Sequence, residues 1–426
     1  MITAPLSFQQ AETLRNMQRN PDCASVYDLI RVFEIDGSVD VDALAAAIGD
    51  LVSRHPALRT SVAQSGSEPL QSVSEHGSSD VERRSGYTDA GFARLLEQLV
   101  GERYGLQEAV SGAPFFRPLL YAGHSTHLLV LRVHHLVYDR WSESVLWRDL
   151  SELYAARLHG RPPSLPELPD TYAEFASAQR AEWPRLAEKA IPFWQAQLSG
   201  YPPEPISWPR TVGTGGDDGN QAADTIRSLS DDGLRRVRQA AQASKVFPFR
   251  VLLAATALAI SRVTQRRDLL LGTSTANRED PRTHDVVGYF TNTRMTRIRL
   301  AEIGTCADVI RSANQSWLES DAFSDSYVDK ILEGVGGDRP TMSRVELMGG
   351  PPVCELEGGG VRPISVVTES KHWRDVDFFW TPNNGSYALR LRHRVATVSE
   401  DLAHRIVDEI ESALADIEAG RPTQRP

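Results

Sequence analysis

Cysteine, long apolar runs and positive charge are all scarce in this chain of 426 residues. Its 3 cysteines are widely spaced and form no CxxC pair, which argues against a disulfide framework or a zinc module. No apolar run reaches the roughly 18–20 residues that span a bilayer, and the N-terminus lacks the basic start and apolar core of a signal peptide. The net charge of -10 is opposite in sign to that of a typical nucleic-acid-binding protein. We therefore expect a cytoplasmic protein that binds neither nucleic acid nor membrane.

Several catalytic signatures are also missing. The chain has no GxSxG, which disfavours a serine hydrolase. It has neither GxxxxGK[ST] nor a strand-associated GxGxxG, so no nucleotide site is indicated. None of the cysteines follows the basic or helix-start context that activates a thiol.

The composition that remains is that of a globular protein, with 41% hydrophobic and 24% charged residues, and the length favours two lobes. Apolar spacing predicts mixed helices and strands, hence an α/β fold. We expect a strand-poor polar excursion over 65–86, two short helices separated by Pro184, and a glycine-rich linker over 209–224. The main predicted elements are helices over 41–53, 230–243, 248–264 and about 399–418, and strands around 126–139, 267–276, 292–300, 375–380 and 387–395.

The predicted strand 126–139 has apolar residues on both faces, which is typical of a central strand covered on both sides. It ends in the sequence His134-His135-Leu136-Val137-Tyr138-Asp139, and Ser142 is a plausible N-cap for the helix that follows. Histidine is the side chain best suited to proton transfer near neutral pH. A hydrogen-bonded structural histidine pair explains the same pattern from local sequence alone. Adjacent histidines on a strand point to opposite faces, so a shared metal ion is disfavoured.

At this point the residues resemble a known family. HHLVYD-RWS is similar to the HHxxxDG(WS) motif of the condensation domains of nonribosomal peptide synthetases, within the superfamily of chloramphenicol acetyltransferase. Further blocks follow in the family's order. Residues 5–10 resemble its PLSxAQ block, 54–60 its RHxxLRT block, 172–176 its YxDFA block and 287–293 its IGxFVNT block.

The resemblance implies an α/β fold of two chloramphenicol-acetyltransferase-like lobes, 1–175 and 176–426, forming a V-shaped pseudo-dimer with the active site at the cleft. It implies that His135 is the catalytic position, acting as base or positioner, and that His134 and Asp139 support the motif. Asp139 would pair with an arginine from the second lobe, for which Arg278 is the candidate. Breaking such a buried pair costs about 3–5 kcal/mol, so loss of activity on mutating Asp139 would not prove catalysis.

One position departs from the family pattern. Arg140 stands where the motif has glycine, which has no side chain and accepts backbone angles that arginine takes at some cost. Arg140 could narrow the acceptor channel, present a cation to a substrate anion, or close the site. Trp141, Tyr289 and Asn292 are further substrate-channel candidates.

The resemblance implies acyl transfer from the phosphopantetheine thioester of a carrier protein to an amine or hydroxyl, with no metal or other cofactor of its own. The sequence has no adenylation signature and no carrier serine block, so we expect a free-standing enzyme with its carrier protein in trans. The acceptor would be a small molecule or carrier-bound. Two alternatives stay open: a catalytically silent domain that recruits a partner to a carrier protein, and a coenzyme-A-dependent acyltransferase with a soluble acceptor. Arg83-Arg84 and Arg235-Arg236 are candidate docking patches for an acidic carrier.

Overall fold

A computed structural model describes most of the chain and groups it into two compact units by contacts within the chain. Unit 1 contains 1–183, 276–291 and 351–369, and unit 2 contains 184–275, 292–350 and 370–426. A single boundary at residue 175 would assign 276–291 and 351–369 to the second lobe, whereas their contacts lie with unit 1. The described residues are 2–36, 38–65, 68–75, 81–85, 91–101, 105–123, 125–202, 204–209, 219–323, 326–336, 340, 342–350, 352–364 and 371–423.

Unit 1 combines a five-stranded sheet of order β12-β2-β7-β6-β5 with a three-stranded sheet of order β1-β4-β3. Its strands are β1 (Ile2–Pro5), β2 (Asp28–Asp36), β3 (Thr60–Ser65), β4 (Glu68–Val73), β5 (Glu82–Ser85), β6 (Phe116–Ala122), β7 (Thr126–His134) and β12 (Val361–Ile364). Its helices are α1 (Phe8–Arg19), α2 (Val41–Arg54), α3 (Phe92–Gly101), α4 (Leu106–Ala109) and α5 (Arg140–Leu158), and the chain leaves it within α6 (Tyr172–Leu198).

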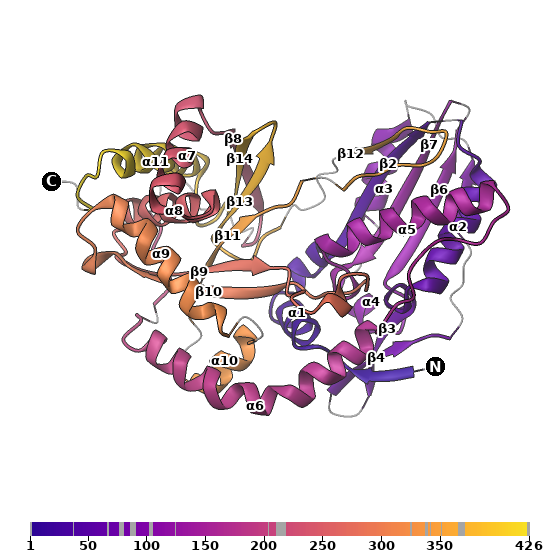
Figure 1. Cartoon of the computed structure of the whole chain (residues 1–426), viewed down its shortest axis with the longest axis horizontal. Helices are drawn as coiled ribbons and strands as arrows, with labels where there is room; N and C mark the ends of the chain where they lie inside the picture. Colours follow the sequence, from indigo (N-terminus) through magenta and orange to yellow (C-terminus); the bar gives the residue numbers. More distant parts are fainter. Residues whose placement is uncertain are drawn as a thin grey trace. The chain divides into compact units, whose positions relative to one another are not determined.

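Strand β7 occupies the middle of the larger sheet and pairs antiparallel with β2 and β6. Leu129 and Leu131 belong to the core that α2 and α5 cover, whereas Leu128 and Val130 belong to a second core on the side of α3. Figure 1 shows α2 and α5 lying against this sheet. Burying an aliphatic side chain contributes about 1.5–3 kcal/mol, so both cores hold β7 in place. The predicted central, doubly covered strand is confirmed.

Unit 2 is built on a six-stranded sheet of order β10-β9-β11-β13-β14-β8, in which β11 is parallel to both neighbours. Its strands are β8 (Ala222–Ser228), β9 (Asp268–Thr275), β10 (Asn292–Arg299), β11 (Ser343–Leu347), β13 (Val376–Asn383) and β14 (Ser386–Arg394). Its helices are α7 (Asp231–Ser244), α8 (Pro248–Thr264), α9 (Cys306–Asp321), α10 (Val328–Val335) and α11 (Glu400–Glu418). One core joins α7, α8, α9 and α11 to the sheet, and α8 is buried along most of its length.

Two local predictions are wrong. The polar stretch 65–86 contains β4 and β5, because backbone pairing with β1, β3 and β6 outweighs its weak apolar pattern. Pro184 does not separate two helices but lies inside α6 on an exposed turn. There the hydrogen bond that proline removes leaves a carbonyl that water can reach.

The glycine-rich linker expected at 209–224 lies largely outside the described residues, and its last three residues belong to β8. In the part of the chain that the structure describes, no single helix is both long and apolar enough to cross a membrane. The bent pair α7 and α8, at 111°, meets that length and composition only when taken together.

Candidate active site

Strand β7 ends at His134, whose side chain is fully buried. Its Nδ1 accepts a hydrogen bond from the backbone N–H of Leu136 at 3.1 Å. Burial away from water, with repulsion from His135 in addition, lowers the pKa of His134 to about 3. Because Nδ1 is an acceptor, the single ring proton sits on Nε2. His134 is therefore held neutral, in one tautomer.

His135 opens the 3₁₀ turn His135–Val137 and, unlike His134, remains partly exposed. The centroid of its ring lies 4.4 Å from that of Tyr289, at an interplanar angle of 59°. On another side, Tyr27 stands edge-on with ring centroids 6.4 Å apart. Aromatic pairs at these separations are mutually attractive and restrict each other's orientation. Of the two histidines, His135 is therefore the one that solvent can reach and that its neighbours orient, as a group for proton transfer requires.

Asp139 is the N-cap of α5, a role that the sequence assigned to Ser142. One oxygen of its carboxylate accepts hydrogen bonds from the Ser142 backbone N–H and hydroxyl, each at 2.8 Å. The other oxygen accepts from the backbone N–H of Phe290 at 2.9 Å. The structure contains the expected ion pair, with Arg278 Nη2 at 3.2 Å from Asp139 Oδ1 and both side chains 1% exposed. Arg278 belongs to unit 1, however, and not to a second lobe as predicted. These contacts hold the start of α5, the backbone at Phe290 and the Arg278 side chain in place.

Arg278 organises the segment 276–291 around this carboxylate. Its Nη1 donates to the carbonyl of Val286 at 2.8 Å and to that of Thr283. Its guanidinium also lies 4.0 Å from the ring centroid of Phe290, a cation–π contact. Burial lowers the pKa of Arg278, while the charge of Asp139 opposes that shift. Asp139 and Arg278 together dock 276–291, which carries Tyr289, onto the start of α5.

Arg140, which replaces the motif glycine, is the first residue of α5. Its backbone is helical, so the conformational cost expected of a non-glycine residue does not arise there. Its Nη1 donates to Glu143 Oε2 at 2.8 Å, and Glu143 also lies 3.4 Å from Arg31 Nε. The Glu143 side chain is 5% exposed and that of Arg140 38%. A buried carboxylate thus balances part of the charge that Arg140 brings to the motif.

The other predicted channel residues fall in different places. Tyr289 contacts His135, as described above. Trp141 is 41% exposed and donates its indole N–H to the carbonyl of His284 at 2.9 Å, so it packs on 276–291. Asn292 belongs to unit 2, where its amide donates to the carbonyl of Ser326 at 2.9 Å. The structure brings together His134, His135, Asp139, Arg278 and Tyr289.

Sequence analysis did not predict that Tyr27, Glu143 or Gln10 also meet this region. Glu143 had a signal, because an acid three residues after Arg140 on a helix is placed to pair with it. Tyr27 reaches the histidines only through tertiary packing, from the 3₁₀ segment before β2. Gln10 matched a family block, but its position gave no hint that its amide reaches the histidine turn.

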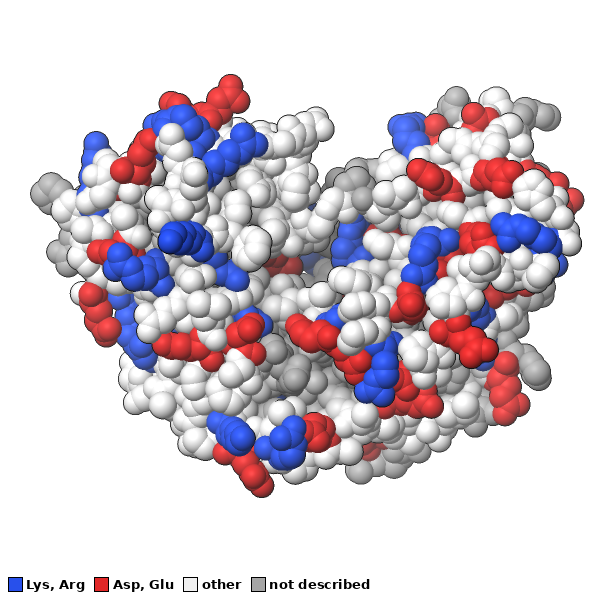
Figure 2. Space-filling model, viewed as in Figure 1, with Lys and Arg blue, Asp and Glu red and all other residues white. Residues whose placement is uncertain are grey.

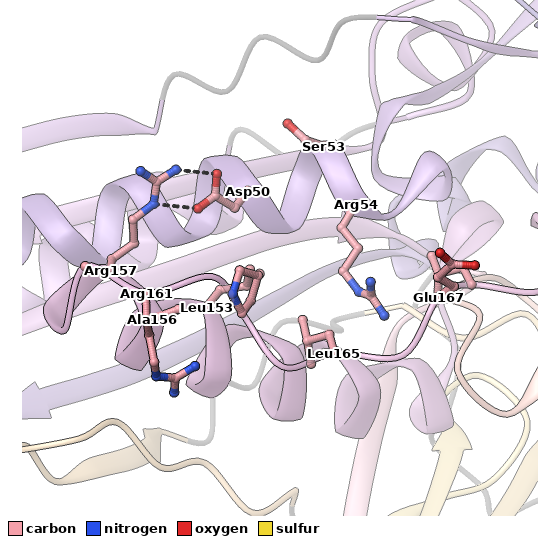
Figure 3. A pocket seen from close by; sticks show the side chains of 12 residues that line it. Asp50, Ser53, Arg54, Leu153, Ala156, Arg157, Arg161, Leu165 and Glu167 are labelled. Atoms are coloured by element: carbon pink, nitrogen blue, oxygen red, sulfur yellow. Dashed lines mark hydrogen bonds and ion pairs between the residues drawn. The ribbon is translucent and has the colours of Figure 1, made fainter.

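A pocket of about 980 Å³ opens elsewhere in unit 1, between the C-terminal halves of α2 and α5 and the proline-rich connector after α5. In Figure 3, Arg157 and Asp50 face each other at this pocket, joined by hydrogen bonds of 2.6 and 2.7 Å. Its α5 residues lie roughly 21–27 Å along the helix from Asp139, at about 1.5 Å per residue. None of the predicted site residues lines it.

Neither metal ligation nor thiol chemistry is supported near the motif. Within the described ranges, no group of three His, Cys, Asp or Glu side chains is arranged to hold a metal ion. Cys354, near Glu143, is half-buried. Burial, reinforced by the charge of Glu143, raises the pKa of the Cys354 thiol to about 12. The histidine turn is therefore the chemically distinctive feature here.

Two α/β units with HHxxxD at the end of a central strand have the fold and motif of the chloramphenicol-acetyltransferase-like class. The sequence profile of the condensation domain matches residues 2–329. The chain belongs to the condensation domain family, and the predicted fold class is confirmed.

The relatives and solved structures that it resembles come from nonribosomal peptide synthesis and related pathways. Phosphinothricin tripeptide synthetase PhsB of Streptomyces viridochromogenes is 29% identical over 345 residues, which cover 78% of this chain and 28% of PhsB. The chain spans less than a third of the length of such curated relatives. The X-domain from teicoplanin biosynthesis superposes with a TM-score of 0.84, at 22% identity, covering 98% of this chain and 96% of that one. The first condensation domain of the calcium-dependent antibiotic synthetase gives 0.76, at 19% identity, covering 99% and 98%. Family membership supports a transferase role in nonribosomal peptide synthesis.

Proposed function

We propose that this chain is a condensation-type acyltransferase. Its donor is an acyl or aminoacyl group held as a thioester on the phosphopantetheine arm of a carrier protein in trans. Its acceptor is an amine or hydroxyl on a small molecule or a second carrier, and the product is an amide or an ester. The observation that carries this proposal is that the two histidines differ in their surroundings. His134 is buried and neutral, whereas His135 is oriented by its neighbours and partly exposed.

In the proposed reaction, His135 accepts the proton of the acceptor amine or hydroxyl, or positions that group. The acceptor nitrogen or oxygen forms a bond to the thioester carbonyl carbon, the carbon–sulfur bond breaks, and the proton passes to the departing thiolate. General-base assistance of this kind is worth about 10²–10⁴-fold in rate. Asp139 and Arg278 act indirectly, by holding the segment that carries Tyr289.

An intact-mass assay tests the proposal with an acyl-loaded carrier protein and a panel of amines and alcohols. Wild type and His135→Ala run beside His159→Ala, a matched control whose histidine is exposed and pairs with Glu357 in the same unit. We expect product from wild type and His159→Ala, and a rate lower by about 10²–10⁴-fold from His135→Ala. Undiminished product from His135→Ala would rule out the proposed role of His135.

A second candidate function is that of a catalytically silent domain that recruits a partner to a carrier protein. Arg140 is the reason to consider it, because this side chain stands where the family motif has glycine and could close the site. The X-domain from teicoplanin biosynthesis, to which the fold is similar, has been solved in complex with OxyB. Carrier binding without product from the wild type with any acceptor would favour recruitment. Product gained only in Arg140→Gly would identify Arg140 as a plug, and loss confined to anionic acceptors would identify it as a recognition residue.

The donor carrier distinguishes the remaining alternative, a coenzyme-A-dependent acyltransferase with a soluble acceptor. Turnover with acyl-coenzyme A and no capture of the holo carrier protein would favour that alternative.

Acidic and basic side chains are interspersed on the face seen in Figure 2. The two arginine pairs considered as docking patches have acidic partners: Arg83 with Asp42, Arg84 with Glu82, and both Arg235 and Arg236 with Glu418. Exposed ion pairs of this kind are each weak, so they do not by themselves decide whether an acidic carrier docks there.

A further inference from the structure

Helix α1 begins with a buried capping box formed by Ser7 and Gln10, both 0% exposed. The Ser7 hydroxyl oxygen accepts from the backbone N–H of Gln10 at 3.1 Å, and Gln10 Oε1 accepts from the backbone N–H of Ser7 at 2.9 Å. A box of this type ordinarily satisfies helix-end donors and nothing more. Here both side chains have a further donor: Gln10 uses it toward the histidine turn, and Ser7 uses it toward Tyr172.

Gln10 reaches the turn directly. Its Nε2 donates to the carbonyl of Leu136 at 2.8 Å, while the N–H of Leu136 donates to His134 Nδ1 at 3.1 Å. Leu136 follows His135 in the chain. Both backbone polar groups of Leu136 are therefore fixed by buried side chains, which sets the direction of the turn that presents His135.

Ser7 acts on Tyr289, whose ring packs beside that of His135. The hydroxyl of Tyr172 donates to the carbonyl of Tyr289 at 2.6 Å and lies 2.8 Å from the hydroxyl of Ser7. Tyrosine has one hydroxyl proton, so Ser7 is the donor in the second bond. The chain Ser7–Tyr172–Tyr289 thus fixes the backbone of the residue whose ring stands 4.4 Å from His135.

We propose that the Ser7–Gln10 capping box is a positioning device for His135, with Gln10 as its principal positioning residue. Neither residue touches the imidazole. One sets the turn that carries His135 and the other sets the aromatic ring beside it, and the box ties both to the start of one helix. The kinetic part of this inference rests on the proposed acyl transfer, whereas the geometric part does not.

Two variants of Gln10 separate positioning from simple helix capping. Gln10→Glu keeps the oxygen that accepts from Ser7 but can donate to the Leu136 carbonyl only when its carboxyl is protonated. Gln10→Met removes both hydrogen bonds at similar volume. The partners of the Gln10 side chain, the Ser7 N–H and the Leu136 carbonyl, do not titrate. The ionisable side chains of the adjoining turn are His134 and His135, so a new pH dependence in Gln10→Glu reports the introduced carboxyl together with its effect on these two imidazoles.

We expect kcat to fall about 10- to 100-fold in Gln10→Met with KM changed little, because a small misplacement of a catalytic group has an effect of that order. In Gln10→Glu the ratio of variant to wild-type kcat should fall as pH rises from about 6 to 9, as the introduced carboxyl ionises. In Gln10→Met that ratio should stay constant. The matched control is Ser230→Ala, which removes the N-cap of α7 in unit 2, and it should leave kcat unchanged.

A second readout does not require turnover. The imidazole resonances of ¹⁵N-histidine-labelled protein are recorded for wild type and variants, with the His135 signal identified by its loss in His135→Ala. We expect the His135 signal to shift or broaden in both Gln10 variants and to stay in place in Ser230→Ala. If the wild type shows no turnover and the His135 signal is still perturbed in the Gln10 variants, the positioning role is supported and the proposed acyl transfer is rejected. Folded Gln10 variants with unchanged kcat and an unchanged His135 signal would overturn the positioning role.

Discussion

The buried His134 makes the stability of unit 1 depend on pH, and a single substitution can separate its contribution from that of the other ionisable groups. Its pKa is about 3 in the folded protein and about 6.5 when exposed, so the unfolded chain binds the extra proton first as pH falls. The contribution of neutral His134 to the free energy of unfolding has its full value above about pH 6.5 and is lost as pH falls from there toward about 3. At about pH 4.5 the loss is the two pH units below 6.5 multiplied by about 1.36 kcal/mol, or about 3 kcal/mol.

The variant His134→Asn tests this reasoning. The asparagine Oδ1 can accept from the Leu136 N–H as His134 Nδ1 does, but it takes up no proton in this range. Hydrogen exchange of a peptide over β7, read by mass spectrometry at about pH 7.5 and 4.5, gives the opening free energy of unit 1 without assuming one transition for the whole chain. His55 and His393, whose pKa values burial also lowers, contribute equally to both proteins.

We expect the opening free energy of wild type to fall by about 3 kcal/mol more than that of His134→Asn over this interval. A constant offset between the two proteins reports lost packing and leaves the argument intact. The same pH dependence in both proteins would refute the assignment of a neutral, acid-sensitive His134.

Three further outcomes follow from the same contacts. Asp139→Asn should destabilise unit 1 by about 3–5 kcal/mol, because it leaves the Arg278 guanidinium buried without its counter-charge. Denaturant unfolding measures this loss, and a variant as stable as wild type would show that the ion pair does not stabilise the fold. Gly288→Ala should destabilise by about 1–3 kcal/mol, seen as a lower Tm, because the new Cβ would overlap the ring of Tyr172; an unchanged Tm would contradict that overlap. At about pH 8 native Cys354 should resist iodoacetamide far longer than an ordinary thiol, since its pKa is about 12 and the thiolate is the nucleophile; rapid labelling read by peptide mass would contradict the raised pKa.

The sequence predicts well those features that depend on local apolar spacing. The strand β7, its two covered faces and the helix α8 all follow from alternating or helical patterns. The family resemblance also pointed to His135 and offered Arg278 as the partner of Asp139, and the structure contains that pair. The roles given to site residues remain predictions.

What the sequence did not reveal depends on side chains meeting across the fold. The cap of α5 is Asp139 rather than Ser142, because the aspartate lies in extended backbone at the helix start and accepts from Ser142. Tyr27 packs near His135 without any periodic signal of its own. The link from Gln10 to the histidine turn crosses 126 positions, and no local pattern encodes such a contact.

Unit 1 is discontinuous, and this has a consequence for its synthesis. Arg278 lies 139 residues after Asp139, and β12 follows later still. At about 5–20 residues per second, the ribosome supplies the arginine roughly 7–28 s after the aspartate. During that interval the carboxylate of Asp139 and the edge of β2 lack their final partners, so unit 1 waits without these contacts. A chain truncated after α5 or within α6 would stay in that waiting state, and an isolated N-terminal half is therefore a poor substitute for the intact chain.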